Sequence, residues 1–213
     1  MSKCLTQAAA LVFRITHRDN VPWIISHGLH SESSDITDPN YVQIGNPDLI
    51  DKRRTRAVGD PYGGTLRDYV AFYFTPFSPM AYNIVTGWNG IQKRSREELV
   101  IIRSSLHRLR AAQQPFIFTD RHAYLATAQP SVDLADLDRI DWPILERRDF
   151  KRDPDDPGKL ERYEAETLVH KHVPLEALLE IICYNDSTLA SLREHLPEGG
   201  LAVPIVAKPK WYF

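Results

Sequence analysis

The chain has 213 residues, 43% hydrophobic and 25% charged, a composition typical of one globular domain with a single sizeable core. Its formal net charge of −2 excludes an overall basic character, so any nucleic-acid site would have to come from local clusters of basic residues. Two cysteines exclude a disulfide framework, and without a signal-peptide layout or a membrane-length apolar run we expect one domain over residues 1–213 in the cytoplasm, with no membrane partner.

The chain opens with a predicted strand, helix and loop. Residues 11–16, LVFRIT, predict the strand because β-branched and aromatic side chains dominate them. The short helix that follows begins at Asp19 or Asn20 and ends at Gly28. Residues 30–48 are rich in Ser, Asp, Asn and Pro and predict a long exposed loop. A loop of that length in a compact domain is usually functional or mobile.

The remaining elements are a basic helix and several strands. The helix has Asn46 as its predicted N-cap and ends at Gly59. Strands are predicted at residues 69–74, 98–105, 115–120, 165–169, 181–184 and 201–208. These strands alternate with short helices without a regular β-α-β rhythm, which indicates an α+β fold.

Glu166 lies inside the predicted strand 165–169. Period-two alternation puts Glu164 and Glu166 on one face with Leu168. A half-buried charge is costly unless it is paired or used, so two interpretations follow. Either this is an edge strand with one wet face, which the stretch alone favours, or Glu166 points into a cleft.

Most familiar catalytic motifs are missing from the sequence. It contains no G-x-G-x-x-G, no P-loop lysine, no G-x-S-x-G and no H-E-x-x-H, so no Rossmann, Walker, serine-hydrolase or metal site is predicted. Cys183 lies among apolar and aromatic neighbours, which is typical of core packing.

Three basic clusters are the remaining candidates for function, although most such clusters are solvated faces. Arg54 stands out because it follows the long loop and precedes the aromatic strand, where a guanidinium could reach a diphosphate or a base. The clusters comprise Lys52, Arg53, Arg54 and Arg56; Lys93, Arg94, Arg96, Arg103, Arg108 and Arg110; and Arg121.

Six stretches taken together resemble the DarT family of bacterial DNA ADP-ribosyltransferase toxins, in the same order and with similar spacing. The resemblance spans nearly the whole chain, and the ordered set is far more specific than any single motif. The stretches are FRITHRDNVPWIISHGL, RRTRAV, GGTLRDYVAFYFTPFSPMAYNI, FIFTDRHA, YEAETLV and KPKWYF.

The resemblance implies an ADP-ribosyltransferase fold, a split β-sandwich that binds NAD between two sheets without a Rossmann loop. It also implies that Glu166 matches the catalytic glutamate of the family and Arg54 its catalytic arginine, assigned as proton acceptor beside the target base. On this comparison Glu166 points into the NAD cleft.

The residue types suit that chemistry. Cleavage of the nicotinamide glycosidic bond develops oxocarbenium character, which a carboxylate such as Glu166 can stabilise. Arginine is a poor base at its ordinary pKa, so physical chemistry alone gives Arg54 anion stabilisation and base positioning, with Glu166 or water as a possible proton acceptor.

The same comparison implies further contacts. It places NAD against Arg14, Ile15, Thr16, Asn20, Trp23, Arg54 and Tyr73. It places His122 on the DNA-facing side, and Arg121 of the basic clusters is our other DNA-binding candidate. Each also has an ordinary structural explanation, such as core packing for Tyr73 and Trp23.

Departures from the family bear on the target base. Relatives have histidine where this chain has Arg14, proline where it has Ala71 and arginine where it has Phe77. These changes favour guanine over thymine as the acceptor. Single-stranded DNA is the expected substrate because a paired base nitrogen is blocked. The family further implies blocked replication and a protective antitoxin of the macrodomain or NADAR hydrolase type.

Three other functions fit the sequence. The first is an NAD-dependent transferase acting on RNA or protein with the same Glu166. The second is a non-catalytic nucleic-acid-binding module, for which Glu166→Gln would change nothing. The third is an NAD glycohydrolase whose nicotinamide release does not depend on DNA.

Overall fold

The computed structural model describes residues 4–196 and 203–213. Its strands are β1 Leu11–His17, β2 Leu29–His30, β3 Tyr69–Tyr73, β4 Leu99–Ser105, β5 Phe116–Thr119, β6 Pro130–Ser131, β7 Glu166–His170, β8 His172–Val173, β9 Glu180–Cys183 and β10 Ile205–Ala207. Its α-helices are α1 Val21–His27, α2 Pro47–Thr55, α3 Pro79–Thr86, α4 Leu106–Ala111, α5 Trp142–Arg147, α6 Lys159–Tyr163 and α7 Asp186–Arg193.

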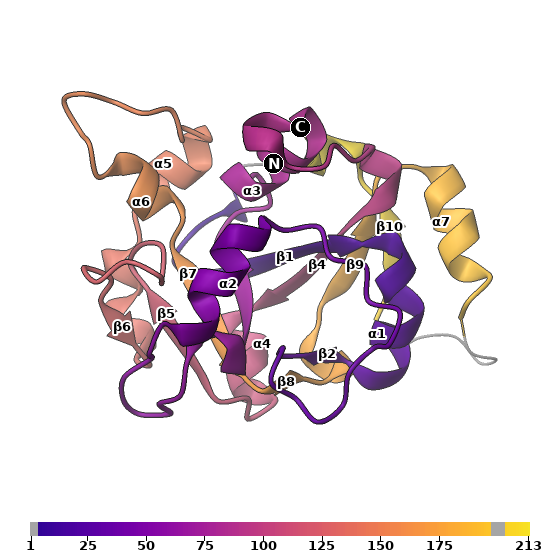
Figure 1. Cartoon of the computed structure of the whole chain (residues 1–213), viewed down its shortest axis with the longest axis horizontal. Coiled ribbons are helices and arrows are strands. Elements are labelled where there is room, and N and C mark those ends of the chain that lie inside the picture. Colours follow the sequence, from indigo (N-terminus) through magenta and orange to yellow (C-terminus); the bar gives the residue numbers. More distant parts are fainter. Residues whose placement is uncertain (1–3, 197–202) are drawn as a thin grey trace.

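Eight strands form one sheet in the order β10-β9-β4-β1-β3-β7-β5-β6, and β2 pairs with β8 in a small second sheet. Helices α5 and α6 lie at the β6 end of the molecule and α7 at the β10 end (Figure 1). The predicted α+β class is confirmed.

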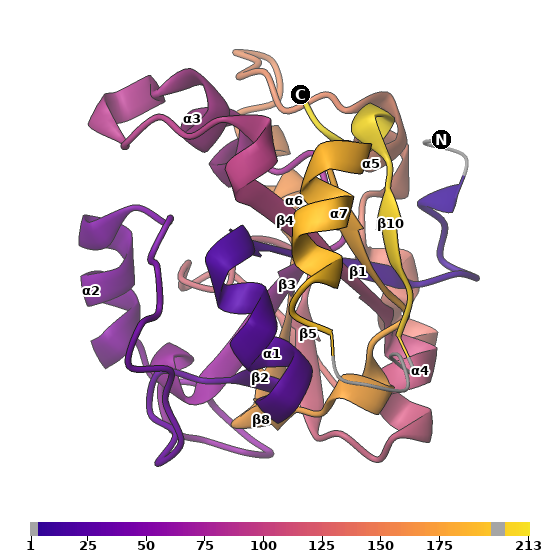
Figure 2. The ribbon, with the colours of Figure 1, turned by 90° about the vertical axis from the view of Figure 1, so that its right-hand side faces the viewer.

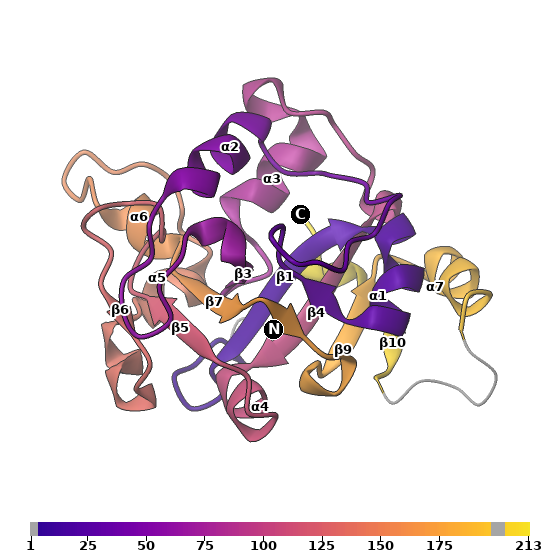
Figure 3. The same ribbon diagram turned by 60° about the horizontal axis from the view of Figure 1, so that its bottom comes forward.

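The large sheet is nearly divided in its middle. β1 pairs with β4 at seven positions but meets β3 only where Phe13 lies opposite Tyr73. Two half-sheets therefore diverge from a single point of contact, as expected for a split β-sandwich. Figure 3 shows β1 and β4 crossing between β7 on one side and β9 on the other.

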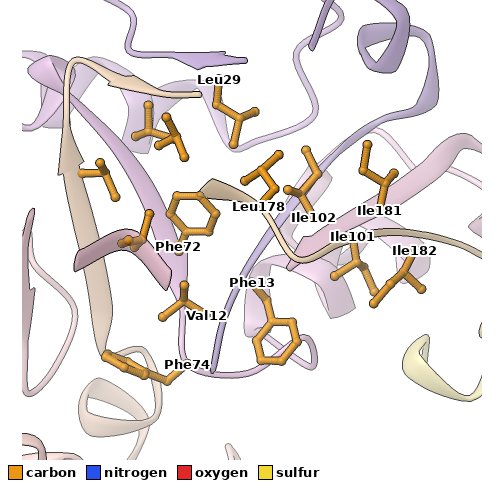
Figure 4. Packing of buried hydrophobic residues seen from close by; sticks show 14 of the residues in the cluster. Val12, Phe13, Leu29, Phe72, Phe74, Ile101, Ile102, Leu178, Ile181 and Ile182 are labelled. Atoms are coloured by element: carbon orange, nitrogen blue, oxygen red, sulfur yellow. The ribbon is translucent and has the colours of Figure 1, made fainter. Parts of the chain in front are cut away.

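The main hydrophobic cluster packs against both half-sheets. Val12, Phe13, Phe72 and Ile102 are each at most 1% exposed and pack together (Figure 4). Cys183 is fully buried in the same cluster, as the sequence predicted. Burial of this apolar surface is the main stabilising contribution to the fold.

β7 corrects one interpretation of the sequence. It lies between β3 and β5 and pairs with both, so it is a central strand and the edge-strand explanation of Glu166 is wrong. Leu168 on the same face is 1% exposed. A carboxylate that is 1% exposed on such a strand is costly unless it is paired within the protein.

Most predicted boundaries agree with the structure within one or two residues. The basic helix is shorter, because α2 ends at Thr55 and Arg56 is already extended, well before Gly59. In the predicted strand 201–208, β10 covers Ile205–Ala207, whereas residues 201 and 202 lie outside the described part. Within the described residues no helix has the length and apolar character to span a membrane.

Candidate active site

A cavity of about 440 Å³ opens where β1 and β3 diverge. This volume falls within the range of about 300–1,000 Å³ typical of small-molecule sites. The loop between β2 and α2 forms one wall, and α2 forms another. Figure 2 shows α2 standing away from the sheet, on the far side of α1 from α7. The long loop predicted from residues 30–48 therefore encloses the cavity.

Arg53 and Glu166 make a paired contact at the cavity wall. Arg53 donates from Nη1 to Oε1 at 3.0 Å and from Nη2 to Oε2 at 2.8 Å. The Glu166 side chain is only 1% exposed and that of Arg53 16%. Two parallel charge-assisted hydrogen bonds fix the plane of the carboxylate as well as its charge.

The environment of Glu166 keeps it ionised. Burial pushes its pKa upward, but the charge and hydrogen bonds of Arg53, with a backbone hydrogen bond from Ala123, hold the pKa below its ordinary value. The neighbouring carboxylate correspondingly raises the pKa of Arg53 against the effect of burial. The pair thus places one negative and one positive charge at the cavity without a net charge.

Arg54, the arginine expected at the site, does not lie at the cavity. Its side chain is 44% exposed and pairs with Glu32 and Asp51. The cause is helical geometry, since consecutive residues point about 100° apart. The residues of the α2 region that line the cavity are Asn46, Leu49, Ile50 and Arg53, which follow the i, i+3, i+4, i+7 spacing of one helix face.

The start of α2 was predictable from the sequence, but its inward face was not. α2 begins as predicted, because the Asn46 side chain accepts a hydrogen bond from the Leu49 N–H at 3.3 Å. None of its residues is buried, however, so the sequence carries no strong apolar stripe to show which face looks inward.

His122 lies beside Glu166 and not on the lining of the cavity. It is 7% exposed, and its Nε2 is 3.5 Å from Glu166 Oε1. Its Nδ1 accepts from the Tyr124 N–H at 3.1 Å, which assigns the proton to Nε2, facing the carboxylate. Burial is the main cause that lowers the pKa of His122; the charge of Glu166 raises this pKa and that of Arg53 lowers it. The imidazole is therefore neutral near pH 7.

Arg121, our other DNA-binding candidate, is engaged elsewhere. Its guanidinium donates to Asp120 at 2.9 and 3.0 Å and lies 3.7 Å from Glu161. It does not line the cavity. A phosphate would have to compete with these carboxylates for Arg121.

The β1 side of the cavity carries three of the predicted NAD-binding residues. Arg14, Ile15 and Thr16 all line it. Arg14 donates to the Ala71 carbonyl at 3.0 Å and so bridges β1 and β3 where the two strands separate. Its guanidinium places a positive charge on the lining of the cavity.

Asn20 has a different place from the one predicted. It is fully buried and does not line the cavity. Its amide donates to Thr16 Oγ1 and to the Val42 carbonyl, both at 3.0 Å, and accepts from the Val42 N–H at 2.8 Å. Asn20 therefore fastens the long loop to β1 and shapes the cavity indirectly.

Two predicted aromatic residues line the cavity as well. Trp23 of α1 stacks on His27 with ring centroids 4.5 Å apart. Tyr73 lies directly opposite Glu166 in the β3–β7 ladder. Burial, then the charges of Glu166 and Glu164, raise the pKa of Tyr73, so its hydroxyl stays protonated.

Several other residues that line the cavity had no predicted role, among them Glu164, Met80 and Asn83. Met80 and Asn83 belong to α3, which the sequence analysis did not predict although Ser78 caps it through the Ala81 N–H at 3.1 Å. Across residues 4–196 and 203–213 there is no cluster of three metal-ligating side chains.

Comparison with known proteins gives a consistent result. A family model described as "ssDNA thymidine ADP-ribosyltransferase, DarT" matches residues 13–213. A DNA ADP-ribosyl transferase of Escherichia coli O127:H6 is 48% identical, covering 100% of this chain and 97% of that protein.

Two solved structures of Thermus sp. 2.9 DarT are similar to the whole fold. The complex with ADP-ribosylated single-stranded DNA has a TM-score of 0.83 at 29% identity, covering 96% of both chains. The complex with NAD+ has a TM-score of 0.80 at 29% identity, covering 96% of this chain and 98% of that one.

Proposed function

Because this chain belongs to the DarT family of NAD-dependent DNA ADP-ribosyltransferases, we propose that Arg53 and Glu166 form the centre at which it transfers ADP-ribose to a base of single-stranded DNA. This proposal rests on the two hydrogen bonds that Arg53 donates to the buried Glu166 at the cavity. The proposed products are free nicotinamide and a DNA strand that carries ADP-ribose on one base.

Glu166 stabilises the charge that develops during the reaction. As nicotinamide leaves, positive charge spreads over C1′ and the ring oxygen of the ribose. An ionised carboxylate already held in place stabilises this charge without reorganising, and low exposure strengthens the interaction. Removing one such preorganised group typically lowers kcat about 10²–10³-fold.

Arg53 takes the place that the sequence analysis gave to Arg54. A guanidinium stays protonated, and the raised pKa of Arg53 strengthens that condition. We therefore give Arg53 two functions, orienting Glu166 and stabilising negative charge on the substrates, and no function as a base.

The cavity suits NAD as the co-substrate. Arg14 offers a cation for the diphosphate, Thr16 a hydroxyl for ribose, and Trp23 and Tyr73 aromatic surface for the planar rings. The volume of about 440 Å³ matches an open site that holds part of an extended dinucleotide.

Two bases are candidates for the acceptor. The departures at Arg14, Ala71 and Phe77 favour guanine, whereas the description of the matched family model names thymidine. In either case the reacting nitrogen must be free of a base pair, so an unpaired strand is the substrate. Arg121 remains our candidate for the DNA side, whereas His122, beside Glu166, acts through that carboxylate.

A modified template base would block replication, so the proposed activity makes the protein a toxin to its own cell. We infer a cytoplasmic location, where NAD and replicating DNA meet, and a cognate antitoxin that hydrolyses the adduct, of the macrodomain or NADAR type. Co-expression with such a hydrolase should restore the growth of cells that make this protein.

The decisive experiment is mass spectrometry of oligonucleotides after incubation with the protein and NAD. Single strands lacking either guanine or thymine, the matching duplexes and an RNA of the same sequence serve as substrates. We expect one ADP-ribose on single-stranded DNA only, with the base located by fragmentation. Glu166→Gln should abolish the adduct while Glu146→Gln, an exposed glutamate of α5, should not.

Other outcomes would redirect the proposal. An adduct on RNA or on added protein, and none on DNA, would establish the transferase with another target. Nicotinamide release at the same rate with and without DNA, and no adduct, would establish a glycohydrolase. DNA binding unchanged by Glu166→Gln, without nicotinamide release from the wild type, would leave a binding module.

A further inference from the structure

Glu164 is a second carboxylate on the cavity lining. It caps the C-terminus of α6, two residues before Glu166, and both side chains line the cavity. Glu166 is committed to Arg53, whereas the Glu164 carboxylate has no hydrogen bond or ion pair with any residue that the structure describes. A half-buried carboxylate without a partner is costly, so its place at a reactive cavity calls for a function.

The surroundings of Glu164 and Glu166 move their proton affinities in opposite directions. Burial is the main cause that raises the pKa of Glu164 to about 7, followed by the negative charges of Glu166 on β7 and Glu161 on α6. Tyr73 of β3 is close enough for the charges of both glutamates to raise its pKa. The charges of Arg53 and Arg14 lower the pKa of Tyr73. The pKa of Glu166 is lowered. Two carboxyl groups whose pKa values differ in this way are suited to different tasks in one reaction.

We propose that Glu164 is the catalytic base that removes the proton from the acceptor base of DNA. This inference rests on the proposed function and assigns one step of it. The N–H proton of the DNA base passes to a carboxylate oxygen of Glu164. The electron pair of that nitrogen forms the bond to C1′ of the NAD ribose. The bond from C1′ to the nicotinamide nitrogen breaks, its electron pair neutralises the pyridinium, and Glu164 afterwards returns the proton to water.

The other groups of the site are poorly suited to this step. Arg53 is permanently charged, and Glu166 has a lowered proton affinity because it is held by Arg53. Tyr73 is protonated over the working pH range. His122 is neutral but does not line the cavity. Glu164 alone among these combines access to the cavity with a proton affinity near neutrality, where a general base is most effective.

Glu164→Gln tests the proposal because it keeps the shape of the side chain and removes its basicity. We expect the single-turnover rate of transfer to single-stranded DNA to fall at least about 100-fold. The affinity for NAD, measured by calorimetry, should stay within about threefold of wild type, because the substitution removes a catalytic group and not a contact that binds NAD. Glu164→Asp should recover part of the rate. Glu146→Gln on α5 is the matched control and should transfer at the wild-type rate.

The pH profile separates a base from a merely structural residue. The wild-type transfer rate should rise with pH and level off above an apparent pKa near 7, and this rise should be missing from Glu164→Gln between about pH 5.5 and 8.5. A wild-type rate and profile in a folded Glu164→Gln variant would overturn the assignment. Wild-type protein that forms no DNA adduct at all would instead overturn the proposed function.

Discussion

Arg53 and Glu166, 113 positions apart in the chain, meet through two hydrogen bonds of 3.0 and 2.8 Å. This contact joins α2, which has no buried residue of its own, to a central strand of the sheet. Because a buried carboxylate without a partner is costly, the pair fixes both the charge of the site and the position of the helix.

Arg53→Ala and Arg54→Ala should differ sharply in activity. Loss of Arg53 leaves Glu166 buried and unpaired, which raises the pKa of Glu166 and lowers transfer to single-stranded DNA at least about 10²-fold. Arg54 makes only exposed ion pairs, worth little, so Arg54→Ala should stay within about threefold of wild type. Transfer rates on one oligonucleotide measure both; equal losses would reject the assignment to Arg53.

His122→Ala should reduce catalysis more than DNA binding. The imidazole faces Glu166 and is 7% exposed, so its removal disturbs the carboxylate more than the DNA surface. We expect about a tenfold lower transfer rate, with DNA affinity by fluorescence anisotropy unchanged, in keeping with the loss of one 3.5 Å electrostatic contact to Glu166. His107→Ala on α4 is the exposed control. Weakened DNA binding with normal turnover would restore His122 to the DNA surface.

Asn20→Ala should loosen the wall of the cavity proposed to bind NAD. Two hydrogen bonds to Val42 would be lost, leaving partly buried polar groups unpaired at a cost of about 1–3 kcal/mol in unfolding free energy. NAD binding should weaken because the loop must be ordered again on binding. Denaturant unfolding and NAD calorimetry check the two effects. Asn40→Ala, in the exposed part of the same loop, should change neither.

Glu98 should make stability depend on acid pH. A hydrogen bond from the Ser95 N–H is the main cause that lowers the pKa of Glu98 from 4.5 to about 2. A lowered folded-state pKa stabilises the protein above about pH 4.5, and this stabilisation is lost as pH falls toward 2. Because the Glu98 side chain is 31% exposed, solvent screens its interactions, and we expect it to contribute about 1 kcal/mol to the free energy of unfolding.

Urea unfolding of Glu98→Gln and wild type at several pH values measures this contribution. The two proteins should differ at pH 7 and converge near pH 2. A difference that stays constant with pH would show that Glu98 acts through packing and not through its charge.

Local sequence was sufficient for the α+β class and for the positions of most strands. Strand propensity in segments such as residues 69–74 and 165–169 is a property of neighbouring residues. The N-cap at Asn46 is local in the same way, because its side chain accepts a hydrogen bond from the N–H of Leu49, three residues later in the chain. These features need no knowledge of the rest of the chain.

The tertiary structure decided which of two adjacent arginines meets Glu166, that β7 is central, and that Glu164 and Glu166 differ in proton affinity. An exposed helix has no stripe of its own to set its rotation, so docking against β7 selects Arg53 and turns Arg54 toward solvent. A pKa depends on burial and on charges brought together from distant segments. The order of residues alone does not contain those distances, and folding creates them.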